Sequence, residues 1–599
     1  MAEELKKRSE VAKENTWATE DLYAGDELWQ ADFKAAQELI PLAEKYRGHL
    51  GDSAEMLYDY LKKNDEMDVL LDRIAGYAAR KHDEDTTNPV YQAMHAQMMS
   101  FYSRLGAAYA FVVPEMVAIP EETYQKFYEQ EPALKPYRRM IERTLACKSH
   151  TRSAAEERIL ADAREVSHVP SEAFAVLNNA DMKFPVVPDG EGGEVRLTHG
   201  NFGQLMESEN REVRKAAFEG LYSVYDQFQN TSASLLYGQI KQQMFYARQH
   251  SYASTMEGAL FQNEIPVEVY RNLIRTVHDN MDQMYRYIAL RKKLLQLDEL
   301  HMYDVYPPIV GGVDKKIPYE EAKEIVYEAL APLGDEYRSH IREGFENRWI
   351  DVYENVGKRS GAYSAGVRVH PYVLLNYSGN LDSVFTLAHE MGHALHSWYS
   401  NNSQPVAYAD YKIFVAEVAS TCNEALLMQH LLGKTTDKKE RAYLLNHALE
   451  GFRTTLYRQT MFAEFEMMIN EMAERGEALT AEVLNKKYHE LVVLYFGKDI
   501  VIDPQIDLEW SRIPHFYYNF YVYQYATGYS AAVALSEKIL SEGEGAVKDY
   551  IRFLSGGSSE DPISLLKIAG VDMSTPKPIE DALKVFAGYI DEMEQLLAE

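Results

Sequence analysis

The chain has 599 residues, 46% of them hydrophobic, which is enough for a large core or for several subdomains. Its formal net charge of −30 argues against nucleic acid and anionic membranes as partners, because both would repel it. The chain has no uninterrupted apolar run of about 18 residues, so we expect no membrane span. Its first residues lack the apolar segment of a secretion signal. The two cysteines, Cys147 and Cys422, are too few for a disulfide framework and favour a reducing cytoplasm.

Amphipathic helices are predicted over most of the chain, because apolar residues recur at spacings of three and four. The clearest stretches are residues 53–63, 69–80, 89–111, 154–164 and 267–293. The stretch FPVVPDGEGGEVRL, residues 184–197, has two short alternating arms around a glycine-rich turn and predicts a β-hairpin. Thr198 or Asn201 can cap the helix that follows. We place a domain boundary near residue 198, although a surface hairpin inside one continuous domain explains the pattern equally well.

A second β-like region covers residues 349–377, which are poor in helical periodicity and rich in valine, tyrosine and glycine. We expect two or three short strands there, the last over residues 372–377. The following stretch, SGNLDSVFTLAHEMGHALHSWYS, is helical in pattern, and Asp382 or Asn380 stands where its N-cap belongs.

Three histidines within this helix raise the question of a metal site. His389 and His393 are four residues apart and lie on one helix face, so both can direct a ring nitrogen at one zinc ion. Glu390 is placed to take a proton from a bound water. A cluster of core histidines is the alternative, but it would have to satisfy two imidazoles and a carboxylate at once. His396 lies about 10 Å from His389 along the helix axis, too far to share the ion, and we expect it to pack or to support the site.

The third ligand is therefore expected on the next helix, residues 410–433, with Asp410 as a plausible N-cap and Gly433 just after its end. Glu417 and Glu424 share its apolar stripe, and buried carboxylates are costly unless paired or metal-bound. Glu417 is the natural third ligand. Glu424 can accept the outward N–H of a ligating histidine, or it can form an ion pair with a buried arginine or lysine.

These residues belong to motifs that resemble the oligoendopeptidase F group of the thimet-oligopeptidase-like zinc metallopeptidases. The motifs are GKRSGAYSAG, HPYVLLNYSGNLDSVFTLAHEMGHALHS, FVAEVASTCNE and THGNFGQLMESENREVRKAAFEGLYSVY, and the similarity covers essentially the whole chain. It implies a mainly α-helical, elongated body with a deep substrate channel and a small β-sheet beside the HEMGH helix. Residues 1–197 would form part of the channel wall and residues 198–599 the catalytic domain.

The resemblance also implies zinc-dependent endopeptidase activity on short oligopeptides in the cytoplasm, with one Zn2+ per chain. It assigns His389, His393 and Glu417 as zinc ligands and Glu390 as general base, in agreement with the spacing argument. A peptidyl dipeptidase-type exopeptidase and a non-catalytic helical peptide-binding scaffold are the alternatives, and the protein is expected to be a monomer or a homodimer.

A tyrosine-rich segment, residues 509–530, is the last candidate region. In helical spacing Tyr518, Tyr521, Tyr525 and Tyr529 form one stripe, and most of these tyrosines are expected in the core. The resemblance implies a histidine and downstream tyrosines here as donors to the substrate carbonyl. His515 matches the histidine, Tyr525 is the better tyrosine match, and Tyr521 is second.

Peptide substrate is expected to add a strand to an edge within residues 360–366, through main-chain hydrogen bonds that tolerate many sequences. Gly361, Tyr363 and His370 are the candidate contacts, with ordinary strand structure as an equal alternative. Such an enzyme would select its substrates by length.

Overall fold

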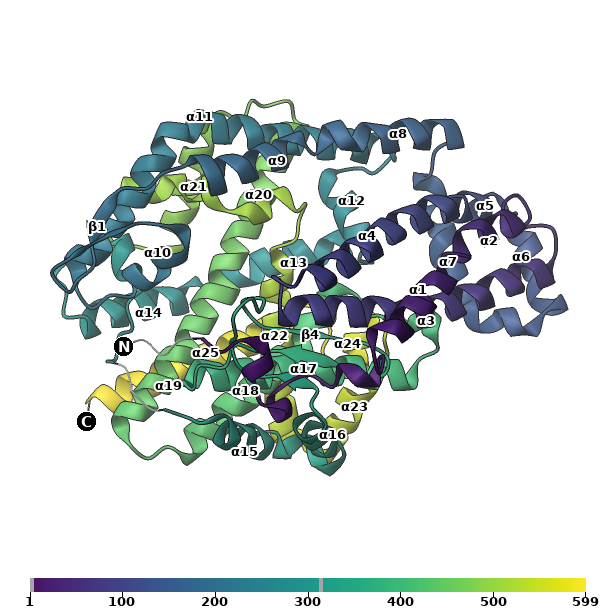
Figure 1. The fold of residues 1–599 in the computed structure, drawn as a ribbon. Helices are drawn as coiled ribbons and strands as arrows, with labels where there is room; N and C mark the ends of the chain where they lie inside the picture. Colours follow the sequence, from purple (N-terminus) through teal and green to yellow (C-terminus); the bar gives the residue numbers. More distant parts are fainter. Residues whose placement is uncertain (1–4, 312–315, 599) are drawn as a thin grey trace. The chain divides into compact units, whose positions relative to one another are not determined.

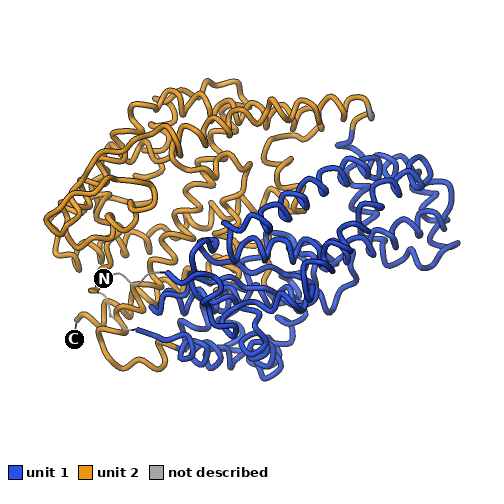
Figure 2. The backbone as a smooth tube through the Cα atoms, in the orientation of Figure 1, with its two compact units in different colours: residues 1–151, 314–430, 535–570 blue, residues 152–313, 431–534, 571–599 orange. Residues whose placement is uncertain are grey.

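The computed structural model describes residues 5–311 and 316–598, and these residues form many helices and two small sheets (Figure 1). The predicted mainly helical class, with a small sheet beside the HEMGH helix, is confirmed. The chain divides into two compact units, each built from three segments (Figure 2). Unit 1 contains residues 1–151, 314–430 and 535–570, and unit 2 contains residues 152–313, 431–534 and 571–599. Among the described helices, none is long and apolar enough to cross a membrane.

Unit 1 holds helices from the beginning, the middle and the end of the chain. They are α1 (Asp26–Ala36), α2 (Leu39–Tyr46), α3 (Ala54–Glu84), α4 (Pro89–Tyr109), α5 (Val112–Ala118), α6 (Glu121–Gln130), α7 (Arg138–Ala146), α15 (Tyr319–Ala329), α16 (Gly334–Glu346), α17 (Leu381–Ser403), most of α18 (Ile413–Lys434), the end of α22 (Tyr523–Glu542), α23 (Glu544–Leu554) and α24 (Pro562–Ile568). The two periodic stretches at 53–63 and 69–80 join into the single helix α3, which Ser53 caps by accepting a hydrogen bond from the Met56 N–H.

The sheet of unit 1 comes from the region predicted to be β-like. Its strands are β3 (Ile350–Asp351), β4 (Tyr363–Ala365) and β5 (Tyr372–Leu374), in the order β3-β5-β4. β5 is central, parallel to β3 and antiparallel to β4, and all three of its residues are buried. The Trp17 indole N–H donates to the Val373 carbonyl at 2.7 Å, so the sheet is attached to the N-terminal core of unit 1. β5 leads directly toward α17, which packs against the sheet.

The boundaries of α17 and α18 follow local chemistry with some differences from prediction. Asn380 is the N-cap of α17 and accepts from the Ser383 N–H at 2.9 Å, whereas Asp382 lies inside the first turn. The prediction of Asp410 as N-cap of the next helix is wrong, because α18 begins only at Ile413. Gly433 is a helical residue of α18, since the helix continues to Lys434.

Unit 2 is also helical and contains the predicted hairpin. Its elements are α8 (Ala154–Ser167), α9 (Val169–Val176), β1 (Val186–Pro188), β2 (Glu194–Arg196), α10 (His199–Met206), α11 (Arg211–Gln249), α12 (Thr255–Phe261), α13 (Val267–His278), α14 (Met281–Leu294), α19 (Lys438–Gly451), α20 (Arg458–Glu474), α21 (Ala481–Phe496), the start of α22 and α25 (Lys577–Ala598). β1 pairs antiparallel with β2, and Thr198 caps α10 through a capping box with Asn201, as predicted.

One helix predicted in unit 2 is broken in the structure. Residues 267–293 form α13 and α14, separated at Asp279 and Asn280. Asn280 leaves the helical backbone region, with φ −123° and ψ 23°, and its side-chain amide donates to the Thr276 carbonyl at 2.9 Å. Asparagine side chains compete with the backbone for hydrogen-bonding partners, which favours a helix end at this position. The helix therefore breaks here although the apolar periodicity continues.

Candidate metal centre

α17 and α18 bring the three predicted ligands together inside unit 1. The His389 and His393 rings have their centroids 4.8 Å apart, and their Nε2 atoms lie 3.3 and 3.4 Å from the same carboxylate oxygen of Glu417. One potential ligand atom from each residue lies within 4.8 Å of the others. Two imidazole nitrogens and a carboxylate oxygen that converge in this way are the donor set of many catalytic zinc sites.

A glycine between the two histidines lets the two helices come this close. A methyl group at Gly392 would lie 2.6 Å from both the Ala419 carbonyl oxygen and the Ser420 Cα, which belong to the backbone of α18. The Asn423 side chain on α18 reinforces the contact by donating to the Ala388 carbonyl of α17 at 3.1 Å. Gly392 is a signal that was missed in the sequence, since a glycine inside a helix costs about 1 kcal/mol relative to alanine and therefore indicates a structural reason.

The carboxylates and imidazoles of this cluster determine one another's ionisation. Burial alone would raise the pKa of Glu417, but the hydrogen bonds and charges of His389 and His393 hold this pKa far below its usual range. Burial alone would lower the pKa of His389, but Glu417 and Glu424 raise it well above its ordinary value. The cluster is therefore built to keep a carboxylate ionised beside the Nε2 atoms.

Glu424 contacts the other side of the first histidine. Its Oε1 lies 2.5 Å from His389 Nδ1, which is the contact predicted for a carboxylate that orients a ligand. With Nδ1 directed at Glu424, Nε2 of His389 faces Glu417 and the space between the three ligands.

Glu390 is buried next to these groups and lacks a complete set of partners. Its side chain is 6% exposed, and its Oε2 atom has no hydrogen-bond partner within the part of the chain that the structure describes. Burial raises the pKa of Glu390, and the charges of His389 and His393 oppose this rise. An unpaired buried carboxylate oxygen is costly. Its presence beside a donor set suited to zinc fits a role in handling a water molecule at that site.

His396 takes the packing role expected of it. The ring is 1% exposed and stacks on Tyr411, with centroids 3.7 Å apart and planes 5° apart, and Phe553 lies at 5.4 Å. Burial, with a smaller contribution from the charge of His393, lowers the pKa of His396 to about 3, so the ring is neutral.

The predicted histidine and tyrosines lie together in unit 2. His515 is in the short 3-10 helix η12 (Pro514–Tyr517), and its Nε2 lies 3.3 Å from the Tyr525 hydroxyl. The ring centroid of Tyr521 is 5.5 Å from that of Tyr525 and 6.1 Å from that of His515. The three side chains therefore form one group of neighbouring rings, in which His515 and Tyr525 share a hydrogen bond.

The expected helical tyrosine stripe in this segment is wrong, because α22 begins only at Tyr523. Asn519 and Phe520 have φ of 58° and 57°, a left-handed conformation that residues other than glycine seldom adopt. The Phe520 N–H donates to Glu466 Oε1 at 2.7 Å, so a buried carboxyl of α20 stabilises this turn. Tyr518 is consequently 58% exposed.

The three candidate substrate contacts lie in or near the sheet of unit 1. Gly361 is exposed with φ 83°, just before the edge strand β4. The Tyr363 hydroxyl donates to Asp83 at 2.7 Å. His370 is 8% exposed, its ring stacks on Trp349, and its Nδ1 lies 2.8 Å from the Pro371 carbonyl. These contacts engage the His370 ring inside unit 1, which favours the structural alternative for its side chain.

Comparison with known proteins places this chain in a family. Residues 204–585 match peptidase family M3, and residues 115–184 match the family segment described as oligopeptidase F. Oligopeptidase PepF of Bacillus subtilis is 52% identical, over 100% of this chain and 89% of that protein, and the group B oligopeptidase PepB of Streptococcus agalactiae is 42% identical, over 99% and 98%.

Solved structures agree. The crystal structure of oligoendopeptidase-F from Enterococcus faecium has a TM-score of 0.76 and 38% identity, covering 96% of this chain and 99% of that one. A solved structure from Chlamydophila abortus has a TM-score of 0.93 and 37% identity, covering 99% and 100%. These matches define a peptidase, and the chain belongs to peptidase family M3, in its oligoendopeptidase F group.

Proposed function

We propose that this protein is a zinc-dependent endopeptidase that hydrolyses internal bonds of short oligopeptides. The observation that carries the proposal is the convergence of His389, His393 and Glu417 beside the buried, incompletely paired Glu390. Membership of family M3 supports peptide hydrolysis, and the donor set supports zinc as the metal.

The roles of the residues follow from their positions. A zinc ion held by His389, His393 and Glu417 would supply Lewis-acid chemistry to a peptide carbonyl and acidify a water molecule. Glu390 would accept a proton at its Oε2 atom and deliver it to the leaving amine. Glu424 would hold the His389 ring in the orientation that keeps Nε2 available.

Replacement of the general base tests this mechanism. Glu390→Gln should lower kcat by about 10^2- to 10^4-fold, the usual contribution of general acid–base catalysis, while the protein keeps stoichiometric zinc. Glu320→Gln, on an exposed side chain of α15 in the same unit, is the matched control and should cleave like the unaltered protein. Zinc content by atomic emission and cleavage of a mixed-length peptide pool with and without chelator are the measurements. Undiminished cleavage by Glu390→Gln would refute the proposed role of Glu390, whereas a protein that neither binds zinc nor cleaves peptides would favour the scaffold alternative.

The endopeptidase assignment has its own test. Mass spectrometry of products from a peptide blocked at both ends distinguishes the two enzyme classes, because an obligate exopeptidase needs a free end. Cleavage of the blocked peptide supports an endopeptidase. Removal of dipeptides from unblocked peptides only would establish the peptidyl dipeptidase alternative.

Further proposals concern the substrate contacts, the domain boundary and the cellular location. We propose that His515 and Tyr525, or Tyr521, donate hydrogen bonds to the substrate carbonyl oxygen, which their common grouping supports. Peptide backbone would pair with β4, which is an edge strand, next to Gly361 and Tyr363. The boundary near residue 198 lies between the two matched family segments. A cytoplasmic location is supported by the free thiols of both cysteines.

A further inference from the structure

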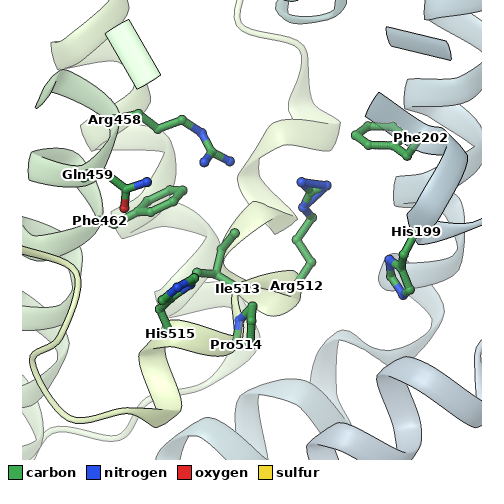
Figure 3. A pocket seen from close by; sticks show the side chains of 9 residues that line it. All are labelled: His199, Phe202, Arg458, Gln459, Phe462, Arg512, Ile513, Pro514 and His515. Atoms are coloured by element: carbon green, nitrogen blue, oxygen red, sulfur yellow. The ribbon is translucent and has the colours of Figure 1, made fainter. Parts of the chain in front are cut away.

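A pocket of about 290 Å³ in unit 2 combines two guanidinium groups with aromatic walls (Figure 3). α10 and α20 contribute opposite sides, and the segment from Arg512 to His515 closes it. The lining residues are His199, Phe202, Arg458, Gln459, Phe462, Arg512, Ile513, Pro514 and His515. Among these residues, His515 is the one predicted from sequence as a functional residue.

The charges around the pocket do not balance. Arg458 forms an ion pair with Glu509 at 2.5 Å, and Glu509 is 3% exposed. The second oxygen of Glu509 accepts from the Tyr488 hydroxyl at 2.5 Å. The charged groups that act on Arg512 are this same Glu509 and the like charge of Arg458. One carboxylate therefore serves two guanidinium groups, and the pocket keeps an excess positive charge.

Arg512 carries this excess charge. Within the described residues, its guanidinium group has no hydrogen bond or ion pair, and its contact is with the face of the Phe202 ring at 5.1 Å from the ring centroid. Figure 3 shows the Arg458 and Arg512 side chains extending toward the middle of the pocket. An arginine presents several donors in a fixed fork that matches a carboxylate, and leaving them unpaired in a pocket is unfavourable. An anion that enters the pocket would match these donors.

The walls indicate which anion. Phe202, Phe462, Ile513 and Pro514 offer apolar surface beside the charge, and the Gln459 amide offers a further polar contact. Burial and the charge of Arg458 lower the pKa of His515, which favours the neutral ring. His515 therefore adds a hydrogen-bonding group to the pocket and no further charge. A small, strongly hydrated inorganic anion gains little from such walls, whereas a peptide residue fills them.

We propose that this pocket binds a carboxylate of the peptide, with Arg512 as the principal contact, and thereby makes the protein prefer peptides that present one. The carboxylate is either the free C-terminus or an acidic side chain close to it, since both have the same chemistry. The proposal rests on the proposed action on peptides. It adds a preference and not a requirement, so blocked peptides remain substrates.

Binding is measured without cleavage, so that the result is independent of the catalytic proposal. The full chain carrying Glu390→Gln is titrated by calorimetry with an acetylated hexapeptide as free acid and as C-terminal amide. A second pair of amidated peptides carries glutamate or glutamine near the C-terminus. The form with the carboxylate should bind about tenfold more tightly in at least one pair, the worth of one charge-assisted contact.

Arg512→Gln tests the location of the site. The ratio of the affinities for the carboxylate and amide peptides should fall from about ten to about one. Only the carboxylate peptide loses a contact, because the amide peptide does not bind through Arg512. Arg475→Gln is the matched control, since this exposed arginine of the same unit pairs with Glu477, and its replacement should leave the preference intact. Arg512→Lys keeps the charge but loses the fork, so it should retain a weaker preference of about threefold. It also tests the site if the Gln variant fails to fold.

Two results would overturn the proposal. Equal affinity of acid and amide, and of glutamate and glutamine peptides, would show that no carboxylate is recognised. A preference that persists in folded Arg512→Gln would place the recognition elsewhere. In a cleaving enzyme, Arg512→Gln should raise KM for the preferred peptide with kcat nearly unchanged, which is the pattern of a lost binding contact.

Discussion

Replacing Gly392 by alanine would put a methyl group at the point where the backbones of α17 and α18 meet. The added Cβ would lie 2.6 Å from the Ser420 Cα and 2.8 Å from the Ser420 nitrogen. Non-bonded carbon atoms rest about 3.5–4.0 Å apart. These neighbours are backbone atoms, so rotation of a side chain cannot relieve the overlap, and α18 has to move about 1 Å away.

This displacement has two consequences of calculable size. Overpacking of this kind costs about 1–3 kcal/mol, and the better helix propensity of alanine returns about 1 kcal/mol, so the net destabilisation should lie at about 0–2 kcal/mol. Glu417 lies three residues before Ser420 and moves with it. A metal ligand must keep its distance within about 0.2 Å. We therefore expect zinc affinity to fall at least about tenfold, with activity falling in parallel.

Zinc affinity by competition with a chelator, peptide cleavage and thermal unfolding are measured together on Gly392→Ala. Gly433→Ala is the matched control, because Gly433 lies in α18 and an added methyl there meets no atom within 4 Å. The control should keep its zinc and be neutral or stabilised by up to about 1 kcal/mol. If Gly392→Ala binds zinc normally and is stabilised like the control, the close approach of the helices does not position Glu417.

Three further predictions concern the metal centre and the buried carboxyl of α20. Glu417→Ala should lose zinc, whereas His396→Ala should keep it and lose about 2–3 kcal/mol of stability from the emptied ring site; metal analysis of both proteins decides, and the reverse result would overturn the ligand assignment. Glu424→Gln should weaken zinc binding by about 10–100-fold in chelator competition, because an amide holds the His389 ring less firmly; unchanged affinity would exclude this role. Burial raises the pKa of Glu466 to about 8, above its unfolded value of 4.5, so the folded protein retains a proton that the unfolded chain releases. Stability should therefore decrease between pH 5 and 8, by at most about 1.4 kcal/mol per pH unit. Glu466→Gln should flatten this dependence in urea unfolding at the two pH values, and an equal slope in both proteins would refute it.

Much of the candidate centre could be predicted from sequence because its relations are local. The spacing of His389 and His393 brings both rings to one helix face by helical geometry alone. Glu417 and Glu424 stood out because carboxylates on an apolar stripe need a partner. In the structure both histidines contact Glu417, and Glu424 contacts His389. Their roles as ligands and orienting group remain predictions for the experiments above.

The tyrosine segment shows where local reasoning fails. Apolar spacing extended a helix through residues 518–529, but the structure has a left-handed turn at Asn519 and Phe520. The cause is Glu466, which is distant in sequence and accepts the Phe520 N–H. Arg458 and Arg512 could not be predicted as pocket residues for a related reason. Which charged groups surround a guanidinium is known only from the tertiary structure.

The sequence by itself determined the helical class, the hairpin, the β-like region and the residue types of a His-His-Glu centre, because propensity, periodicity and capping depend on neighbours within a few positions. Only the tertiary structure decided how closely α17 and α18 approach, which carboxylate oxygen faces both histidines, and that Arg512 points into a pocket beside Phe202. Those features depend on packing between segments far apart in the chain. The lack of a side chain at Gly392 lets two helix backbones meet, and the buried carboxyl of Glu466 stabilises a left-handed turn at Phe520.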